Sequence, residues 1–186
     1  FIGNEKFVVF LGDNIIQKSI REYVNEFKLS DVSASLLLCK VPNPSSFGIA
    51  ELKNEKIVKI IEKPKEPKSN LAVTGIYFLT PTIFEIIANL KPSWRNELEI
   101  TDALDQMLEK NEKITYHMIT DYWKDTGTPE DVLHANKQIL KKIIGNSEYR
   151  GKDNSIISNN SIIGEGSIIR GNSVISSSVI IGKNCI

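Results

Sequence analysis

The stretch Phe7-Val8-Val9-Phe10-Leu11-Gly12-Asp13-Asn14 sets the fold class of this chain, because an uninterrupted apolar run ends abruptly at a glycine and a carboxylate. Consecutive apolar residues, among them β-branched and aromatic ones, predict a fully buried strand in a parallel sheet. Ligands of open α/β sheets bind beyond the carboxyl ends of the strands. Asp13 and Asn14 are therefore expected at a ligand-facing edge, although an aspartate after a strand can also cap the next helix.

The composition is that of a globular protein without an evident charged partner. The chain has 186 residues, of which 41% are hydrophobic and 25% charged, so disorder does not describe it as a whole. Its formal net charge is zero, which favours neither nucleic acid nor an anionic membrane as a partner. No segment has the pattern of a membrane span or a signal peptide. Cys39 and Cys185 fit neither metal nor disulfide spacing and are expected to be buried thiols in the reducing cytoplasm.

Residues 1–150 alternate short apolar runs with helical periodicity, which is typical of an α/β domain around a mixed sheet. Thr128 precedes Pro129 and lies three residues before Asp131, and this order predicts an N-terminal cap for the last helix. Beyond the opening strand, the sequence predicts strands at 33–39, 48–52, 57–61 and 73–79, helices at 15–28, 101–110 and 129–144, and a further helix capped by Thr80.

Residues 151–186 contain a six-residue repeat and are expected to form a second domain. Isoleucine recurs at positions 157, 163, 169, 175 and 181, and another aliphatic residue precedes it each time. A period of six predicts a left-handed parallel β-helix, in which each hexad forms one side of a triangular coil. Because one coil takes three hexads, the five hexads from Ser155 make fewer than two coils, and we expect only the beginning of such a domain here.

Several short segments of the first domain have residues suited to a ligand. Glu62-Lys63-Pro64 follows the 57–61 strand, where a lysine can bind phosphate and a glutamate can accept hydrogen bonds from sugar hydroxyls. A solvated ion pair before a loop is the alternative interpretation. Gly48 either lets a ligand approach the backbone or serves a simple turn. Val73-Thr74-Gly75 opens a strand with small residues, which suits a wall that faces a ligand.

A second strand-end carboxylate comes late in the domain. Trp123-Lys124-Asp125-Thr126-Gly127 combines an aromatic ring, a carboxylate and a turn glycine, an arrangement that can present Asp125 to a cleft. Asp13 and Asp125 together suit Mg²⁺, which is bound through one or two carboxylates with water and substrate phosphates. The carboxylates of 97–102 are expected to complement a helix dipole, and the isolated histidines at 117 and 134 to be structural.

Taken together, six segments resemble the sugar-1-phosphate nucleotidyltransferases, and among them most closely the enzymes that transfer a thymidylyl group. Their order and spacing match over residues 1–145, and the hexads resemble the β-helix of the family's long form. The resemblance implies a Rossmann-like α/β fold with a mixed sheet, of which this chain holds the C-terminal portion. The six segments are residues 11–14, 47–48, 62–64, 72–77, 97–102 and 123–127.

The resemblance also implies a reaction. The phosphate of glucose 1-phosphate would attack the α-phosphorus of dTTP, so that dTDP-glucose forms and pyrophosphate leaves. Lys63 would contact the attacking phosphate, while Asp13 and Asp125 would hold Mg²⁺ and so help neutralise the charge. Glu62, Gly48 and Val73 would hold the sugar. The residues that the resemblance places at the substrates are Asn14, Gly48, Glu62, Lys63, Val73 and Trp123.

Two features depart from the family. Phe47 stands where tyrosine is frequent, which removes a hydroxyl group. The family's glycine-rich loop for the triphosphate does not occur in these residues, so we expect an inactive fragment of such an enzyme. Two alternatives stay open, namely an enzyme that uses UTP and a non-catalytic regulatory subunit that keeps the sugar-phosphate pocket. Unpaired sheet and coil edges also predict a homo-oligomer.

Overall fold

The computed structural model describes residues 2–144, 155–158 and 161–186, and its chain divides into two units, residues 1–125 and 126–186. The domain boundary expected between residues 150 and 151 lies outside the described residues. Within the described ranges, no helix combines the length and apolar composition needed to cross a lipid bilayer.

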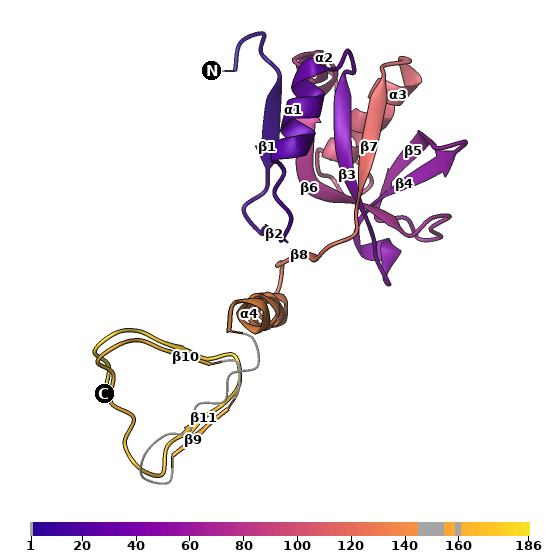
Figure 1. The fold of residues 1–186 in the computed structure, drawn as a ribbon. Coiled ribbons are helices and arrows are strands. Elements are labelled where there is room, and N and C mark those ends of the chain that lie inside the picture. The colour runs from indigo at the N-terminus through magenta and orange to yellow at the C-terminus, as the bar shows by residue number, and fades with distance from the viewer. Residues whose placement is uncertain (1, 145–154, 159–160) are drawn as a thin grey trace. The chain divides into compact units, whose positions relative to one another are not determined.

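The first unit is built on a mixed sheet whose strand order is β5-β4-β6-β3-β7, with β1 also paired to β6 (Figure 1). In the described part of this sheet, β3 and β7 run parallel, and the other paired strands are antiparallel. The strands are β1 (Phe7–Phe10), β3 (Ala34–Lys40), β4 (Gly48–Lys53), β5 (Lys56–Glu62), β6 (Leu71–Leu79) and β7 (Ile114–Ile119).

The opening strand differs from the prediction of a fully buried strand in a parallel sheet, which is wrong. β1 runs antiparallel to β6, and the side chains of Val8 and Phe10 are 37% and 45% exposed. Phe7 and Val9 point to the other face and pack on the main core. An apolar run cannot separate a buried central strand from one that is covered on a single face, because period-two alternation is visible only when the open face is polar.

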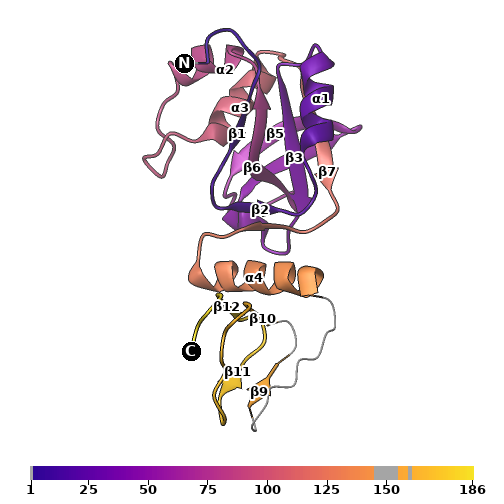
Figure 2. The same ribbon diagram turned by 60° about the vertical axis from the view of Figure 1, so that its left-hand side comes forward.

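Helices cover both faces of the sheet, as Figure 2 shows for α1 (Arg21–Leu29) on one side and α2 (Thr82–Ile87) and α3 (Ile100–Glu109) on the other. Successive residues of β3 alternate between the two resulting cores, since side chains of a strand point to opposite faces. Leu36 and Leu38 pack with α2 and α3, whereas Leu37 packs with α1. Each fully buried leucine contributes about 1.5–3 kcal/mol to folding.

Most predicted elements form within a few residues of the predicted bounds. The helix expected at 15–28 begins only at Arg21, because residues 14–16 form β2 (Asn14–Ile16), which pairs antiparallel with β8 (Trp123–Asp125). The β4–β5 hairpin closes at Asn54 and Glu55, whose φ angles of 49° and 59° fit a tight hairpin turn. Thr80 does not cap α2, because its hydroxyl donates to the carbonyl oxygen of Ser33. A short 3₁₀ helix, η1 (Pro44–Ser46), precedes β4.

The second unit contains α4 (Pro129–Ile144) and short strands of the hexad segment. The predicted cap is confirmed, since the amide of Asp131 donates to Thr128 Oγ1 at 3.2 Å. Ile156 pairs in parallel with Val174, and Ile162 with Ile180, an interval of 18 residues in both cases. The paired strands are β9 (Ile156–Ile157) with β11 (Val174–Ile175), and β10 (Ile162–Ile163) with β12 (Ile180–Ile181).

The two cysteines are free thiols, but they are not the buried residues that the sequence suggests. Cys39 is half-buried on β3, and Cys185 is exposed near the end of the chain. Their reduced state agrees with the absence of disulfide spacing. Burial was the wrong expectation because the end of a half-covered strand and a segment outside the strands both leave small side chains accessible.

Candidate functional site

The candidate site lies where the sheet is interrupted beside β6. On one side of β6, β1 pairs with residues 76–79 and β4 pairs with residues 71–72, and no strand in the described ranges pairs with residues 73–75 there. The segment that follows β1 and the segment that precedes β4 therefore meet at this gap. The site therefore lies at a gap between two antiparallel partners of β6. The sequence predicts a site at the edge of a parallel sheet, and this prediction is wrong.

One pocket of about 250 Å³ occupies this position, and all eight predicted site residues line it. They come from the junction of β1 and β2, the start of β4, the end of β5 and the residue after it, the first half of β6, and β8. Residues 73–75 were predicted to begin a strand, but they lie inside β6, which begins at Leu71. The predicted residues are Asp13, Asn14, Gly48, Glu62, Lys63, Val73, Trp123 and Asp125.

Asn14 holds several parts of this pocket together. Its Oδ1 accepts hydrogen bonds from the Gly75 amide at 3.0 Å and from Trp123 Nε1 at 2.8 Å. Its Nδ2 donates to Asp13 Oδ1 at 2.9 Å, and the residue is only 6% exposed. Asn14 thus orients the Asp13 carboxylate and the Trp123 ring. A side chain at Gly75 would collide with it, because an added Cβ would lie 2.4 Å from Asn14 Nδ2.

Asp13 and Asp125 are brought to the same end of the first unit. In the β2–β8 pair Asn14 lies opposite Asp125, so that Asp13, the residue before Asn14, is adjacent to that position. No cluster of three or more histidine, cysteine, aspartate or glutamate side chains suited to a metal occurs among the described residues. Two carboxylates nevertheless fit Mg²⁺, which keeps several waters and takes further oxygen ligands from substrate phosphates.

Glu62 is fixed by α3. Thr101 Oγ1 donates to Glu62 Oε2 at 3.0 Å, and the Cβ that a larger residue at Gly48 would add lies 2.4 Å from Thr101 Cγ2. Gly48 is therefore required for the close approach of β4 to α3, a reason that the sequence did not show. Burial raises the pKa of the Glu62 carboxyl, while the Thr101 hydrogen bond and the nearby charges of Lys63 and Arg95 lower it.

Lys63 follows Glu62 in an unusual backbone conformation. Its φ of 40° lies in the left-handed region, which costs energy for a residue with a side chain and is common at functional sites. The Lys63 amide donates to the carbonyl oxygen of Phe47 at 3.0 Å, which ties the end of β5 to the segment before β4. This turn places a half-buried lysine on the wall of the pocket.

Aromatic residues complete the wall. Phe47 and Trp123 meet edge to face, with ring centroids 5.8 Å apart and an interplanar angle of 62°. Tyr77 is 6% exposed, and burial together with the negative charges of Glu62, Asp13 and Asp125 raises its pKa to about 12. Its hydroxyl is therefore protonated at neutral pH and can donate a hydrogen bond. Tyr77 is not among the predicted site residues, because a tyrosine inside an apolar strand resembles a core residue.

Glu99 also differs from the expectation of helix-dipole complementation. It occupies the N-cap position of α3 but makes no side-chain cap hydrogen bond. Its Oε1 instead accepts from Ser93 Oγ at 3.1 Å and from Arg95 Nη1 at 3.0 Å. Glu99 and Thr101 both line the pocket, so this segment serves the site as well as the helix.

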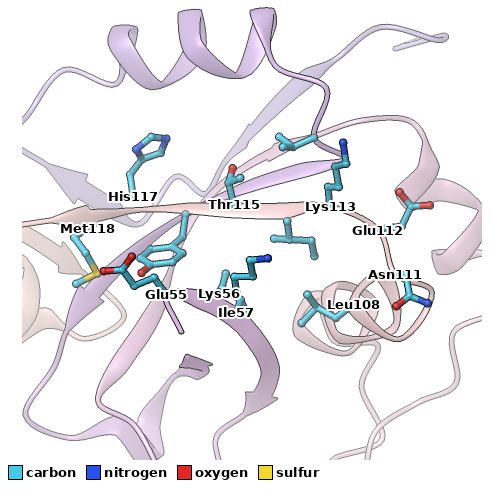
Figure 3. A pocket seen from close by; sticks show the side chains of 13 residues that line it. Glu55, Lys56, Ile57, Leu108, Asn111, Glu112, Lys113, Thr115, His117 and Met118 are labelled. Atoms are coloured by element: carbon cyan, nitrogen blue, oxygen red, sulfur yellow. The ribbon is translucent and has the colours of Figure 1, made fainter. Parts of the chain in front are cut away.

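A larger groove of about 930 Å³ lies elsewhere, between β7, the start of β5 and the end of α3 (Figure 3). None of the predicted site residues lines it. The Lys113 and His117 side chains on its rim pair with Asp31 and Glu26, respectively. The convergence of polar groups marks the smaller pocket as the candidate site, since ligand sites combine apolar walls with a few placed polar groups.

The arrangement agrees with a known family. A family model described as nucleotidyl transferase matches residues 1–142. The chain belongs to the nucleotidyl transferase family. The predicted membership in the sugar nucleotidyltransferases is thereby confirmed at the level of the family, together with an α/β fold and a mixed sheet.

This nucleotidyl transferase is similar to proteins with several different names. The low-salt glycan biosynthesis nucleotidyltransferase Agl11 of Haloferax volcanii is 44% identical over 142 residues, 76% of this chain and 40% of that protein. The glucose-1-phosphate thymidylyltransferase of Streptomyces griseus is 41% identical over 142 residues, which are 76% of this chain and 40% of that protein. The bifunctional protein GlmU of Methanococcus maripaludis is 42% identical over 162 residues, 84% of this chain and 37% of that protein. The chain thus spans about 40% of the length of these relatives.

Solved structures show the same fold. A Bacillus anthracis protein described as a glucose-1-phosphate thymidylyltransferase, in complex with a sucrose, aligns with a TM-score of 0.67 and 42% identity over 81% of this chain and 58% of that one. A UDP-glucose pyrophosphorylase complexed with UDP-glucose aligns with a TM-score of 0.66 and 31% identity over 76% of this chain and 58% of that one.

Proposed function

We propose that this nucleotidyl transferase takes part in forming dTDP-glucose and pyrophosphate from glucose 1-phosphate and dTTP, and that its pocket binds the sugar phosphate. The observation that carries the proposal is the convergence of Glu62, Lys63, Asp13 and Asp125 on one pocket from three separate segments of the chain. Carboxylates that accept hydroxyl hydrogen bonds, a lysine for phosphate and two aspartates for a cation are the groups that this transfer needs.

Each group has a separate task in this proposal. The Glu62 carboxylate accepts hydrogen bonds from sugar hydroxyls, and Tyr77 on β6 donates one. The Lys63 ammonium attracts the phosphate that attacks the α-phosphorus of the nucleotide, and pyrophosphate leaves as that bond forms. Asp13 and Asp125 would hold Mg²⁺, which supplies neutralisation of phosphate charge when it is bound. The Phe47–Trp123 wall excludes water from one side of the pocket.

The choice of nucleotide rests on the relatives. Proteins named glucose-1-phosphate thymidylyltransferase are 41–42% identical to this chain, whereas the UDP-glucose pyrophosphorylase complexed with UDP-glucose is 31% identical. This difference favours dTTP. A UTP-using enzyme is the second candidate, because that pyrophosphorylase aligns with nearly the same TM-score, 0.66 against 0.67. Comparing dTTP with UTP as the nucleotide in an assay of pyrophosphate release separates the two.

We also propose that the hexad segment begins a left-handed parallel β-helix. The parallel pairing of residues 18 apart supports this, because three hexads are the length of one coil. Ile157 and Ile175 are half-buried in the strands whose preceding residues, Ile156 and Val174, are exposed. The second residue of each pair would thus face the interior of the coil.

Isothermal titration tests the substrate proposal on the chain as it stands. Glucose 1-phosphate is expected to bind to one site, and glucose and glucose 6-phosphate to bind at least about tenfold more weakly, because the phosphate must reach Lys63 while the hydroxyls reach Glu62. Glu62→Gln and Lys63→Gln should each weaken binding. Lys53→Gln, at the exposed far end of the β4–β5 hairpin, is the matched control. Equal affinity for the three sugars, or no effect of the two variants, would contradict the proposal.

A further inference from the structure

Arg95, in the segment between α2 and α3, contacts three carboxylates at once. Its Nη2 lies 2.9 Å from Glu97 Oε2, and its Nη1 lies 3.0 Å from Glu99 Oε1 and 3.7 Å from Glu62 Oε1. The guanidinium is largely buried, with a side-chain exposure of 23%. A planar fork with several donors suits this arrangement better than a lysine would. Sequence reasoning did not select Arg95.

The segment that carries Arg95 forms a tight turn, which brings Arg95 close to Glu99. The Ser93 amide donates to the carbonyl oxygen of Glu97 at 2.8 Å, and the Asn96 amide donates to that of Ser93 at 2.9 Å. Asn96 takes the left-handed conformation with φ of 61°, which asparagine tolerates. The resulting tight turn directs Arg95 and Glu99 toward each other, where Ser93 Oγ bonds the same carboxylate.

The contact fixes the carboxylate of Glu62 from two sides. Thr101 Oγ1 bonds Oε2, while Arg95 faces Oε1, so that both oxygens are held by groups outside β5. The charged groups around Glu62 are Lys63 on its own strand end, Arg95 in the turn and Glu99 before α3. Tyr77 on β6 contributes a neutral hydroxyl. Without Arg95, Glu62 would face Glu99 with Lys63 as its remaining countercharge among these groups.

We propose that Arg95 is a positioning residue, which keeps Glu62 ionised and oriented to accept hydrogen bonds from the hydroxyl groups of a bound sugar 1-phosphate. This inference rests on the proposed function of the pocket. Arg95 acts through Glu62 rather than through the sugar. Its effect therefore depends on pH, because Glu62 accepts hydrogen bonds through both oxygens only while it is a carboxylate. The effect also depends on Glu99, the other carboxylate that Arg95 neutralises.

Titration of glucose 1-phosphate between about pH 5 and pH 8 tests this role. Arg95→Gln should bind about tenfold more weakly at neutral pH, the effect of one lost charge-assisted contact. Its affinity should also begin to fall at a higher pH than that of the wild type, since the charge that lowers the pKa of Glu62 is gone. Arg95→Lys keeps the charge and should retain the wild-type pH profile with a smaller loss of affinity. Arg21→Gln, on an exposed arginine of α1, is the matched control.

A double variant separates this role from a structural one. Adding Glu99→Gln to Arg95→Gln removes the repulsion between the two carboxylates and should return the pH profile toward that of the wild type. Loss of affinity with an unchanged profile in Arg95→Gln, or an Arg95→Lys profile like that of Arg95→Gln, would overturn the inference. Failure of the wild type itself to bind glucose 1-phosphate at any pH would instead contradict the proposed function.

Discussion

At the scale of single residues, the pKa of Tyr77 reflects first the burial of the pocket and then its negative charge. The tyrosine hydroxyl is buried near three carboxylates, and its pKa is raised from 10.0 to about 12. The folded chain therefore retains the proton more tightly than the unfolded chain does. This contribution to stability is fully present below about pH 10 and is lost as the pH rises through about 12.

The substitution Tyr77→Phe tests this property. Between the two pKa values, the unfolding free energy of the wild type relative to the variant should fall by roughly 1.4 kcal/mol per pH unit. Urea unfolding of both proteins, from neutral pH to the alkaline limit of the folded state, measures the difference. A difference that stays constant across this range would show that the hydroxyl does not lie in the charged, buried environment described here.

The residues that sequence reasoning found and missed have a common physical explanation. Glu62 and Asp125 are the last residues of β5 and β8, and Asp13 lies shortly after β1, so that each carboxylate is found near the end of a strand. Tyr77 instead lies within an apolar run. Arg95 lies in a turn, and its contacts with Glu62 and Glu99 can be recognised only in the folded structure. Contacts between distant segments are not encoded in local pattern, so these residues needed the structure.

At the scale of secondary-structure elements, the gap between β1 and β4 is closed by the contact of Asn14 with β6. An alanine at Gly75 would place its Cβ 2.4 Å from Asn14 Nδ2 and 3.0 Å from Oδ1. Because Asn14 also bonds Asp13 and Trp123, the variant Gly75→Ala should displace three parts of the pocket. Overpacking of this kind costs about 1–3 kcal/mol of stability.

Urea unfolding measures that cost, and Gly12→Ala supplies the control. Gly12 precedes Asp13, has no atom within 4 Å of an added Cβ, and should change stability by less than about 0.5 kcal/mol. Binding of glucose 1-phosphate should weaken only in Gly75→Ala. Equal stability and equal binding of the two variants would mean that Asn14 does not organise the pocket.

Element type was predictable from the sequence where periodicity was strong, whereas strand direction was not. The β4–β5 hairpin and α4 form close to their expected bounds, because turn residues mark the bend of the hairpin and a capping threonine marks the start of α4. β1 instead pairs antiparallel with β6, and residues 14–16 leave the expected helix to pair with β8. In both cases the conformation depends on pairing with a strand that is distant in the sequence, which local propensity does not predict.

At the scale of the whole molecule, one family matches residues 1–142 and the hexads follow. The similarity covers about 40% of the length of the relatives, so the complete reaction stays a proposal, as do the homo-oligomer and the β-helix. The central claim is narrower. It states that a divalent cation at Asp13 and Asp125 and a sugar phosphate at Lys63 and Glu62 share one pocket.

Phosphorus NMR of glucose 1-phosphate with Mn²⁺ tests that claim most directly, because Mn²⁺ suits the same carboxylate and phosphate oxygens as Mg²⁺ and broadens signals only at short range. With the wild-type chain present, the phosphorus signal should broaden more than with Mn²⁺ alone. In the double variant Asp13→Asn with Asp125→Asn, this additional broadening should disappear. Broadening that is the same for both proteins, or no greater than with free Mn²⁺, would contradict a shared site for the cation and the sugar phosphate.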